Sequence, residues 1–299
     1  MVPKISIITV VYNCVNTLEE TILSVINQNF DNFEFIIIDG GSTDGTLDII
    51  KKHQDQITLW ISEPDNGIYD AMNKGISKAK GDFIYFLGGD DLLYDNSVLL
   101  ITSTRLLDKN TTYYGNVLFK SKNIFYDGKF NSLKIVTRNI CHQSIFYTKN
   151  VFQNQTFDTK YKIFADYVLN LKLFGNSNYS FKYIPVTIAL YNDKGISGSN
   201  GIDVNFKNDT QLNFILKFKD FPFRANTFNI IIFILIIFVV MRPLADIRKN
   251  ILRMADGAYS FSADINHRNI NDALLTFLQS QKHQGKSFLV ADSAIYHMK

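Results

Sequence analysis

The chain has 299 residues, of which 46% are hydrophobic, so it is long enough and apolar enough to bury a core in one or two domains. Its 31 lysines and arginines are spread among 28 acidic residues, which gives a formal net charge of only +3. Nucleic acid is therefore not an expected partner. The two cysteines, Cys14 and Cys141, lack the spacing of a disulfide framework or a zinc site, as in proteins of the reducing cytoplasm.

Apolar strands alternate with amphipathic helices in the first part of the chain. Ile5–Val11 is predicted to be a buried strand. Thr17 and Glu20 form the sequence pattern of a capping box, which predicts a helix that runs to about Gln28. Repetition of this alternation predicts a mainly parallel sheet.

Three further strands are predicted before residue 90, at Phe35–Ile38, Thr58–Ile61 and Phe83–Leu87. A helix is expected from the glycine turn after Asp39 to about Gln54. Open parallel sheets bind ligands beyond the carboxyl ends of their strands. The polar clusters at Asp39, at Asp65–Asp70 and at Asp90 are therefore expected to converge at one edge of the sheet.

A helix is also predicted after Gly67, with two different faces. The apolar positions recur at helical spacing and predict a buried stripe of Ile68, Met72, Gly75, Ile76 and Ala79. Asp70, Asn73 and Lys74 share another face. After about Thr112 the expected strands are shorter and mixed in direction, and one helix is predicted from about Ala165 to Phe174.

Asp90 and Asp91 follow the predicted strand Phe83–Leu87 and suit a divalent metal site. Mg²⁺ or Mn²⁺ held by one or two carboxylates stabilises a departing diphosphate as a Lewis acid. An aspartate pair that caps the next helix or lies in a solvated turn is the alternative on these residues alone.

Four segments, in order along the chain, resemble motifs of the family 2 glycosyltransferases: Ser6–Asn13, Ile38–Thr46, Ser62–Ile76 and Phe86–Asp91. The segment Ser62–Ile76 is similar to the branch of that family found in O-antigen and capsule clusters. The resemblance covers roughly residues 4 to 200 and implies a GT-A fold, an α/β architecture with a Rossmann-like mixed sheet flanked by helices. It also implies transfer of a sugar from a nucleotide diphosphate donor.

The resemblance assigns the nucleotide to the first two motifs. It implies that Tyr12 stacks on the donor base beside the backbone of Val10, and that Asp39 accepts a hydrogen bond from the base or ribose. Uracil or another pyrimidine is the base that it implies. A strand-end aromatic for Tyr12 and a turn former for Asp39 are the structural alternatives.

The remaining donor contacts are expected at the later motifs. Asp70 and Asn73 are candidates for binding sugar hydroxyls, beside a helix start whose unpaired N–H groups suit an anion. A first-turn acid that favours the helix dipole is an equal alternative for Asp70. Asp90 is the expected metal ligand, and Asp91 is assigned to the donor.

The second half of the chain is expected to carry the general base and the acceptor contacts. An inverting transfer needs a base that deprotonates the acceptor hydroxyl opposite the leaving diphosphate. Ile163–Tyr167 resembles the late acidic motif of the family, which implies that Asp166 is this base; a helix N-cap is the alternative. Cys141–Ser144 is also similar to the family and suggests His142 on the acceptor side, although a lone histidine is more often structural.

The chain departs from the family pattern at three positions. Gly88 stands where many members have the first aspartate of Asp-x-Asp, Gly40 replaces a second acid, and Met72 replaces a frequent arginine. Asp90 is therefore expected to carry most of the metal ligation, and the metal and the helix N-terminus to neutralise the diphosphate. A degenerate fold that binds sugar nucleotides without turnover is the alternative that these positions favour.

The C-terminal quarter is predicted to be separate from the transferase domain. The predicted parts are a GT-A domain over residues 1–222, an apolar membrane-associated helix over 223–241 and a helical tail of unknown function over 242–299. The apolar run of this helix, over residues 227–241, has about fifteen residues, a length between that of an interfacial helix and that of a short membrane span. Basic residues flank both of its ends, so charge gives no orientation, and an in-plane helix is preferred.

The tail also has a short resemblance to another family. Arg242–Leu244 with Ile247, Ile251, Met254 and Asp256 is similar to the membrane-proximal start of a HAMP signalling domain. A membrane signalling protein is therefore a further alternative, although no kinase, cyclase or methyl-accepting sequence follows. A nucleotidyltransferase on a related fold is disfavoured because the Gly-rich, basic start is absent.

Together these features predict an inverting, metal-dependent transferase that moves a sugar from a UDP-sugar to a lipid-linked oligosaccharide in O-antigen, capsule or exopolysaccharide synthesis. No secretion signal is evident before Ile5. The expected location is the cytoplasm, at the inner face of the plasma membrane, with the membrane surface as a partner. A homo-oligomer is left open.

Overall fold

The computed structural model describes residues 4–131, 134–135, 138–193 and 203–209. The predicted apolar helix at 223–241, the tail with its HAMP-like segment and the boundaries between these parts lie outside the described residues. Within the described ranges, no helix combines the length and the hydrophobicity needed to cross a bilayer.

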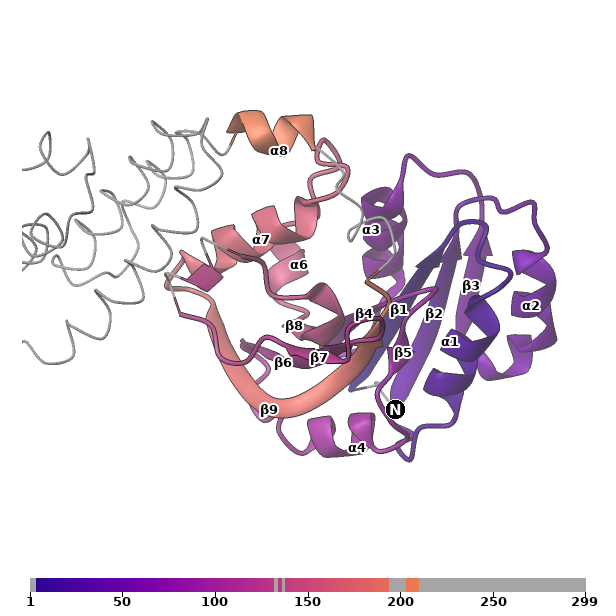
Figure 1. The fold of residues 1–299 in the computed structure, drawn as a ribbon, viewed down its shortest axis with the longest axis horizontal. Helices are drawn as coiled ribbons and strands as arrows, with labels where there is room; N and C mark the ends of the chain where they lie inside the picture. Colours follow the sequence, from indigo (N-terminus) through magenta and orange to yellow (C-terminus); the bar gives the residue numbers. More distant parts are fainter. Residues whose placement is uncertain (1–3, 132–133, 136–137, 194–202, 210–299) are drawn as a thin grey trace, which may run out of the picture. The chain divides into compact units, whose positions relative to one another are not determined.

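In the described part of the chain, nine strands form one mixed sheet, in the order β3-β2-β1-β4-β8-β6-β9-β5, with β7 paired to β6 (Figure 1). The strands are β1 (Ile5–Val11), β2 (Phe33–Asp39), β3 (Leu59–Ser62), β4 (Phe83–Gly88), β5 (Leu92–Leu93), β6 (Thr111–Phe119), β7 (Ile124–Tyr126), β8 (Ile145–Thr148) and β9 (Ser180–Tyr191). Strands β3, β2, β1 and β4 are parallel. Strand β8 is antiparallel to β4 and β6, whereas β9 is parallel to β6 and antiparallel to β5.

The helices cover both faces of this sheet. They are α1 (Leu18–Ile26), α2 (Thr46–Lys52), η1 (Gln54–Gln56), α3 (Ile68–Lys78), α4 (Val98–Ser103), η2 (His142–Ser144), α6 (Val151–Asn154), α7 (Ala165–Phe174) and α8 (Val204–Asp209). The predicted α/β fold with a mixed sheet and flanking helices is confirmed.

The two faces of the parallel strands contribute to two hydrophobic clusters. Successive side chains of a strand point to opposite faces. On one face Ile8 and Ile36 pack in a cluster with Met72 of α3 and with buried residues of α7. On the other face Ile7 and its neighbours pack with α1, α2 and α4. Because both faces are covered, these strands are apolar throughout, which is why their sequence predicted them well.

Several local predictions need correction. Thr17 precedes α1, but its hydroxyl donates to the carbonyl of Gly89 (2.8 Å) instead of capping the helix, so the predicted capping box does not form. Helices α1 and α2 end at Ile26 and Lys52, a short way before the predicted ends. In the second half the strand directions are mixed as predicted, but β6 has 9 residues and β9 has 12, so these strands are not short.

The predicted buried stripe of α3 is correct at Met72, Gly75 and Ala79, whereas Ile76 is only partly buried and Ile68 is not buried. Ile68 is 38% exposed, whereas the next residue, Tyr69, is 5% exposed. Met72 and Ala79 are buried as predicted. The helix is therefore rotated so that Tyr69 faces the core and Ile68 faces solvent.

Candidate active site

The carboxyl ends of β1 and β2 are joined by a hydrogen-bonded loop pair. The hydroxyl of Ser42 accepts a hydrogen bond from the backbone N–H of Asn13 (2.8 Å), and the side-chain oxygen of Asn13 accepts one from the N–H of Thr43 (3.0 Å). Asn13 has a left-handed φ of 53°, which asparagine tolerates better than most residues. Tyr12, directly before it, is 62% exposed, so its ring is free to stack on a ligand at this edge.

Asp39 is the last residue of β2 and is fully buried. Its carboxylate accepts hydrogen bonds from the backbone N–H groups of Gly41 (3.1 Å) and Ser42 (3.0 Å), and from the hydroxyl of Ser62 (2.7 Å). The hydroxyl of Ser42 donates to it as well. A carboxylate has about four acceptor positions, so these donors fix its orientation. Its predicted contact with a base or ribose stays a prediction.

The acid that the sequence lacks at position 40 has a spatial substitute. A Cβ atom added to Gly40 would lie 2.5 Å from Oδ2 of Asp65, so the carboxyl group of Asp65 fills the space beside the end of β2. Its other oxygen accepts a hydrogen bond from the N–H of Gly67 (2.8 Å), at the start of α3. Sequence reasoning placed Asp65 at the correct edge but gave it no role.

The end of β4 carries the aspartate pair. Asp90 is partly exposed, and its Oδ2 accepts a hydrogen bond from the side-chain amide of Asn192 (2.8 Å). Asp91 is 1% exposed, and its two oxygens accept from the backbone N–H of Asn192 (2.7 Å) and from Nε2 of Gln143 (2.7 Å). The structure therefore gives Asp91 a supporting position behind Asp90, and its predicted donor contact is not tested.

Burial raises the pKa of Asp91 from 3.8 to about 6, and the nearby charge of Asp90 adds to this effect. The two neutral donors lower the pKa in part but do not cancel the cost of desolvation. Asp91 also occupies the space next to Gly88, because a Cβ there would lie 2.6 Å from its Oδ2. The aspartate missing at position 88 is thus replaced in space by a buried neighbour.

Helix α3 begins at Ile68 after Gly67, whose φ is 115°. Asp70 accepts a hydrogen bond from the N–H of Asn66 (3.0 Å). Lys74 forms an ion pair with Glu63 (2.9 Å), and this pairing raises the pKa of Lys74. The positive charge of Lys74, near the start of this helix, is therefore partly neutralised by Glu63.

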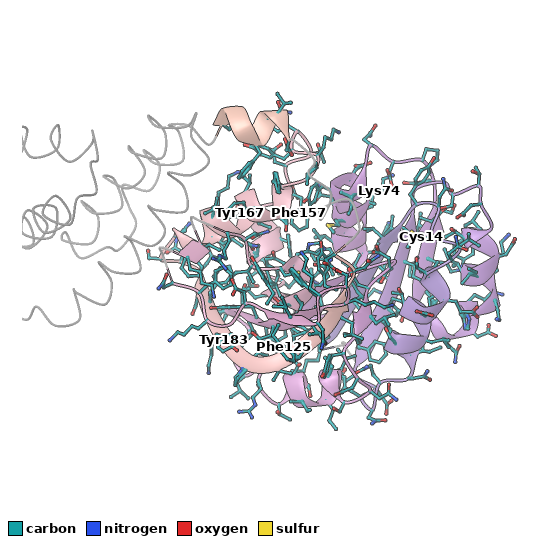
Figure 2. The ribbon with its side chains drawn as sticks, viewed as in Figure 1. Cys14, Lys74, Phe125, Phe157, Tyr167 and Tyr183 are labelled. Atoms are coloured by element: carbon teal, nitrogen blue, oxygen red, sulfur yellow. The ribbon has the colours of Figure 1, made fainter. Side chains whose placement is uncertain are left out.

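Asn73 links α3 to Phe157, which lies in the segment before α7. Figure 2 labels Phe157 and also Lys74, the residue after Asn73 in α3. Its amide donates to the carbonyl of Phe157 (2.8 Å), and its oxygen accepts from the N–H of the same residue (3.0 Å). Both polar groups of the side chain are thus used inside the protein. Its predicted contact with a sugar hydroxyl stays untested.

Asp166 lies in the first turn of α7 and is 6% exposed. Its Oδ1 is 2.8 Å from the hydroxyl of Tyr69, and its Oδ2 accepts a hydrogen bond from Nδ2 of Asn139 (2.7 Å). His142 is close, with Nδ1 3.5 Å from Oδ2. The alternative role of Asp166 as the helix N-cap is wrong, because the N-cap residue of α7 is Phe164 and no side chain caps this helix.

Two adjacent residues bring the aspartate pair and Asp166 to one region. Gln143 bonds to Asp91, and His142 lies next to Asp166. Because both belong to η2, the carboxyl end of β4 and the start of α7 are held side by side. Sequence reasoning noted this segment but missed Gln143, Asn139 and Asn192; only Gln143 lay in a recognisable motif.

The residues at the end of β4 fit a divalent metal that is completed by a substrate. Among the described residues no group of three or more His, Cys, Asp and Glu side chains could hold an ion by itself. Asp90 presents Oδ1, for which the described part of the chain supplies no hydrogen-bond donor. Mg²⁺ is commonly bound by one or two carboxylates together with substrate phosphates, and this chain offers that arrangement.

Comparison with known proteins identifies the family. The family model "Glycosyl transferase family 2" matches residues 6–168, which is more than half of the chain. The chain belongs to this family. The match includes Tyr12, Asp39, Asp90 and Asp166, so these residues lie within the family domain.

Related sequences agree with this assignment. A "PGL/p-HBAD biosynthesis glycosyltransferase" of Mycobacterium bovis is 33% identical over 211 residues, which are 68% of this chain and 82% of the relative. An uncharacterized glycosyltransferase of Haemophilus influenzae is 36% identical over 138 residues, covering 45% of this chain and 53% of the relative. The chain is therefore a glycosyltransferase.

Solved structures share the fold at low sequence identity. The TarS 1-349 structure from S. aureus in complex with UDP-GlcNAc has a TM-score of 0.64 at 18% identity, covering 92% of this chain and 81% of that chain. The chain spans 44% of a longer TarS structure. Mannosyltransferase PcManGT from Pyrobaculum calidifontis, in complex with GDP-Man and Mn²⁺, has a TM-score of 0.55 at 16% identity, covering 99% and 84%.

Proposed function

We propose that this protein is an inverting, metal-dependent glycosyltransferase that moves a sugar from a UDP-sugar to a lipid-linked oligosaccharide. The observation that carries the proposal is the position of four groups. The exposed ring of Tyr12, the buried carboxylate of Asp39 and the partly exposed carboxylate of Asp90 lie at or just after the carboxyl ends of β1, β2 and β4. The buried acid Asp166 of α7 is held next to the end of β4 by η2. UDP and UDP-GlcNAc in the related TarS structures support a uridine nucleotide.

The proposed roles follow from the chemistry of each group. Tyr12 stacks on the base beside the backbone of Val10, and Asp39 orients the nucleoside. Asp90 holds the metal, which when bound supplies Lewis-acid stabilisation of the departing diphosphate. The Mn²⁺ in the PcManGT structure supports this choice of ion.

Asp166 is proposed as the base. It takes the proton of the acceptor hydroxyl as that oxygen attacks the anomeric carbon and the bond to the diphosphate breaks. Asn139 and Tyr69 hold its carboxyl group in place. His142, 3.5 Å away, borders the acceptor side of this group.

The proposed acceptor and location rest on the sequence. A lipid-linked glycan of O-antigen, capsule or exopolysaccharide synthesis fits the branch that Ser62–Ile76 resembles. The basic flanks of the apolar segment at 223–241 support attachment to the inner face of the plasma membrane. Asp70, Asn73 and Asp91 complete the proposed donor side.

The test is release of nucleoside diphosphate by the full chain in detergent, from a panel of UDP-, GDP- and dTDP-sugars, with a membrane lipid extract as the acceptor source. We expect turnover with one UDP-sugar in Mn²⁺ and its loss in EDTA. Asp90→Ala and Asp166→Ala are expected to lower kcat by about 100-fold or more. The exposed Asp48→Ala on α2 is the matched control and retains wild-type kcat.

Two other outcomes would contradict the proposal. Turnover in EDTA that Asp90→Ala does not reduce would exclude the metal role of Asp90. Binding of UDP without turnover of any donor, in the presence of the lipid extract, would favour the degenerate binding module that Gly40, Met72 and Gly88 suggest.

A further inference from the structure

Tyr69 has a position that the predicted stripe of α3 did not include. Its side chain is buried, and its hydroxyl oxygen is 2.8 Å from Oδ1 of Asp166 and 2.6 Å from the carbonyl oxygen of Ile163. Tyr69 comes from the donor-side helix α3, whereas the other two residues lie at the start of α7. The ring also packs against Phe157, with centroids 5.4 Å apart, so the hydroxyl has little freedom to move.

The two contacts of this hydroxyl cannot both be satisfied when Asp166 is ionised. A phenol carries one hydrogen, and a carbonyl and a carboxylate are both acceptors only. If Tyr69 donates to Asp166, its oxygen faces the oxygen of Ile163 with no hydrogen between them. If it donates to Ile163, the same conflict arises with Oδ1.

Protonation of Asp166 removes the conflict. The carboxyl O–H on Oδ1 then donates to the oxygen of Tyr69, and Tyr69 donates to the carbonyl of Ile163. Both hydrogen bonds are made at once. The arrangement therefore favours the protonated base by one hydrogen bond over the ionised base.

The other carboxyl oxygen has its own fixed donor. Tyr147 donates to Oδ1 of Asn170 (2.8 Å), Asn170 donates to Oδ1 of Asn139 (2.9 Å), and Asn139 donates to Oδ2 of Asp166 (2.7 Å). Each group in this series of hydrogen bonds donates toward Asp166, so Oδ2 of Asp166 accepts the last of them. The Asn139 amide cannot accept a hydrogen bond from a protonated Oδ2, whereas the oxygen of Tyr69 can accept one from a protonated Oδ1, so we assign the transferred proton to Oδ1.

We infer that Tyr69 is a positioning residue that accepts a hydrogen bond from the protonated base Asp166 during transfer. The inference rests on the proposed function. The acceptor O–H bond breaks, its hydrogen becomes the Oδ1–H of Asp166, and its electron pair forms the bond to the anomeric carbon. The bond to the diphosphate breaks with its electrons, and the new Oδ1–H is directed to Tyr69.

Other titratable groups face Asp166 as well. They are His142 at 3.5 Å and, with charge interactions, Cys141 before η2, Tyr126 of β7 and Tyr147 of β8. Burial raises the pKa of Tyr69 itself well above the ordinary value of a tyrosine, so it stays protonated near neutral pH. Of these neighbours, His142 is the one whose charge ordinarily changes between pH 5 and 8.

The test compares Tyr69→Phe with Tyr113→Phe, which removes the hydroxyl of another buried tyrosine, on β6, where it accepts a hydrogen bond from the N–H of Asp108. The readouts are kcat from pH 5 to 9, with the donor found in the panel assay, and the Kd of UDP by calorimetry. Tyr69→Phe is expected to lower kcat about 10-fold or more and to leave the Kd of UDP within twofold. The acid limb of the kcat profile is expected to move to lower pH, because the variant lacks the oxygen that accepts the hydrogen bond of protonated Asp166.

Asp166→Asn separates the inference from the proposed function. If Asp166→Asn is inactive but Tyr69→Phe behaves like Tyr113→Phe, the inference is overturned and the base stands. If Asp166→Asn retains wild-type kcat, the proposed base fails, and the inference fails with it. An acid limb that disappears in His142→Gln belongs to that histidine and also overturns the inference.

A second measurement tests the inference even if Tyr69→Phe does not fold. Incorporation of 3-fluorotyrosine at position 69 keeps the ring and the hydroxyl but weakens the oxygen as an acceptor. The acid limb is expected to move in the same direction, by a smaller amount. An unchanged profile for the fluorinated protein overturns the inference.

Discussion

The buried carboxyl group of Asp91 should make the stability of this domain depend on pH. It is 1% exposed, its partners Gln143 and Asn192 are neutral donors, and burial raises its pKa from 3.8 to about 6. We predict that Asp91→Asn, which has nearly the same shape but no titrating proton, removes this dependence. The perturbation changes charge in one buried place and leaves the surrounding apolar core intact.

The size of the effect follows from the difference between the two pKa values. About two pH units, from 3.8 to about 6, correspond to about 3 kcal/mol at 1.36 kcal/mol per unit, with no reduction for solvent screening at such an enclosed site. The folded state holds this proton more tightly than the unfolded chain, so the unfolded chain ionises first as pH rises. The contribution to stability is complete below pH 3.8 and is lost as pH rises to about 6.

The assay is urea unfolding of the full chain in EDTA, at intervals from pH 4 to pH 7.5. The free energy of unfolding of wild type minus that of Asp91→Asn should fall by about 2.5 kcal/mol across this range, because part of the effect is already lost at pH 4. The exposed Asp48→Asn on α2 should give a curve parallel to wild type. If Asp91→Asn also runs parallel to wild type between pH 4 and 7, the assignment of a raised pKa to Asp91 is refuted.

Two glycine substitutions test close contacts near the site and in the core. Gly40→Ala places a Cβ 2.5 Å from Oδ2 of Asp65, a movable group, so we expect less than about 1 kcal/mol of destabilisation. If Asp65 takes the place of the missing acid in donor binding, its displacement should also raise the Kd for UDP several-fold, and an unchanged Kd would show that it does not. Gly75→Ala places a Cβ 2.5 Å from Cγ2 of Ile8 in the core, so we expect a loss of about 1–3 kcal/mol in urea unfolding, and an unchanged midpoint would contradict this packing.

The parallel half of the fold was predictable because its signals are local. Runs of apolar residues bounded by polar turns located β1 to β4, and the same runs placed Asp39 and Asp90 at strand ends. The bounds of α7 match the prediction at both ends, from Ala165 to Phe174. The direction and length of the later strands depend on pairings between distant segments, which no local pattern specifies.

The missed features have two physical causes. The phase of the α3 stripe was set by Ile68, although Tyr69, Met72, Ile76 and Ala79 also recur at helical spacing and include the residues that the core buries. Thr17 was assigned to its own helix, but Gly89, far along the chain, supplies the acceptor that its hydroxyl uses. Similarly, the contact of Asn192 with the aspartate pair arises only when β9 pairs with β5.

Strand β9 has a practical consequence for shortening the chain. It is the long curved strand of Figure 1, and it lies between β6 and β5 in the sheet. The region that defines the family ends at residue 168, before this strand begins. A chain cut there would expose the backbone of β6 as an open sheet edge, and Asp91 would be left with a buried charge and one donor fewer. The smallest unit that can keep its acidic pair in order must therefore extend at least through Asn192.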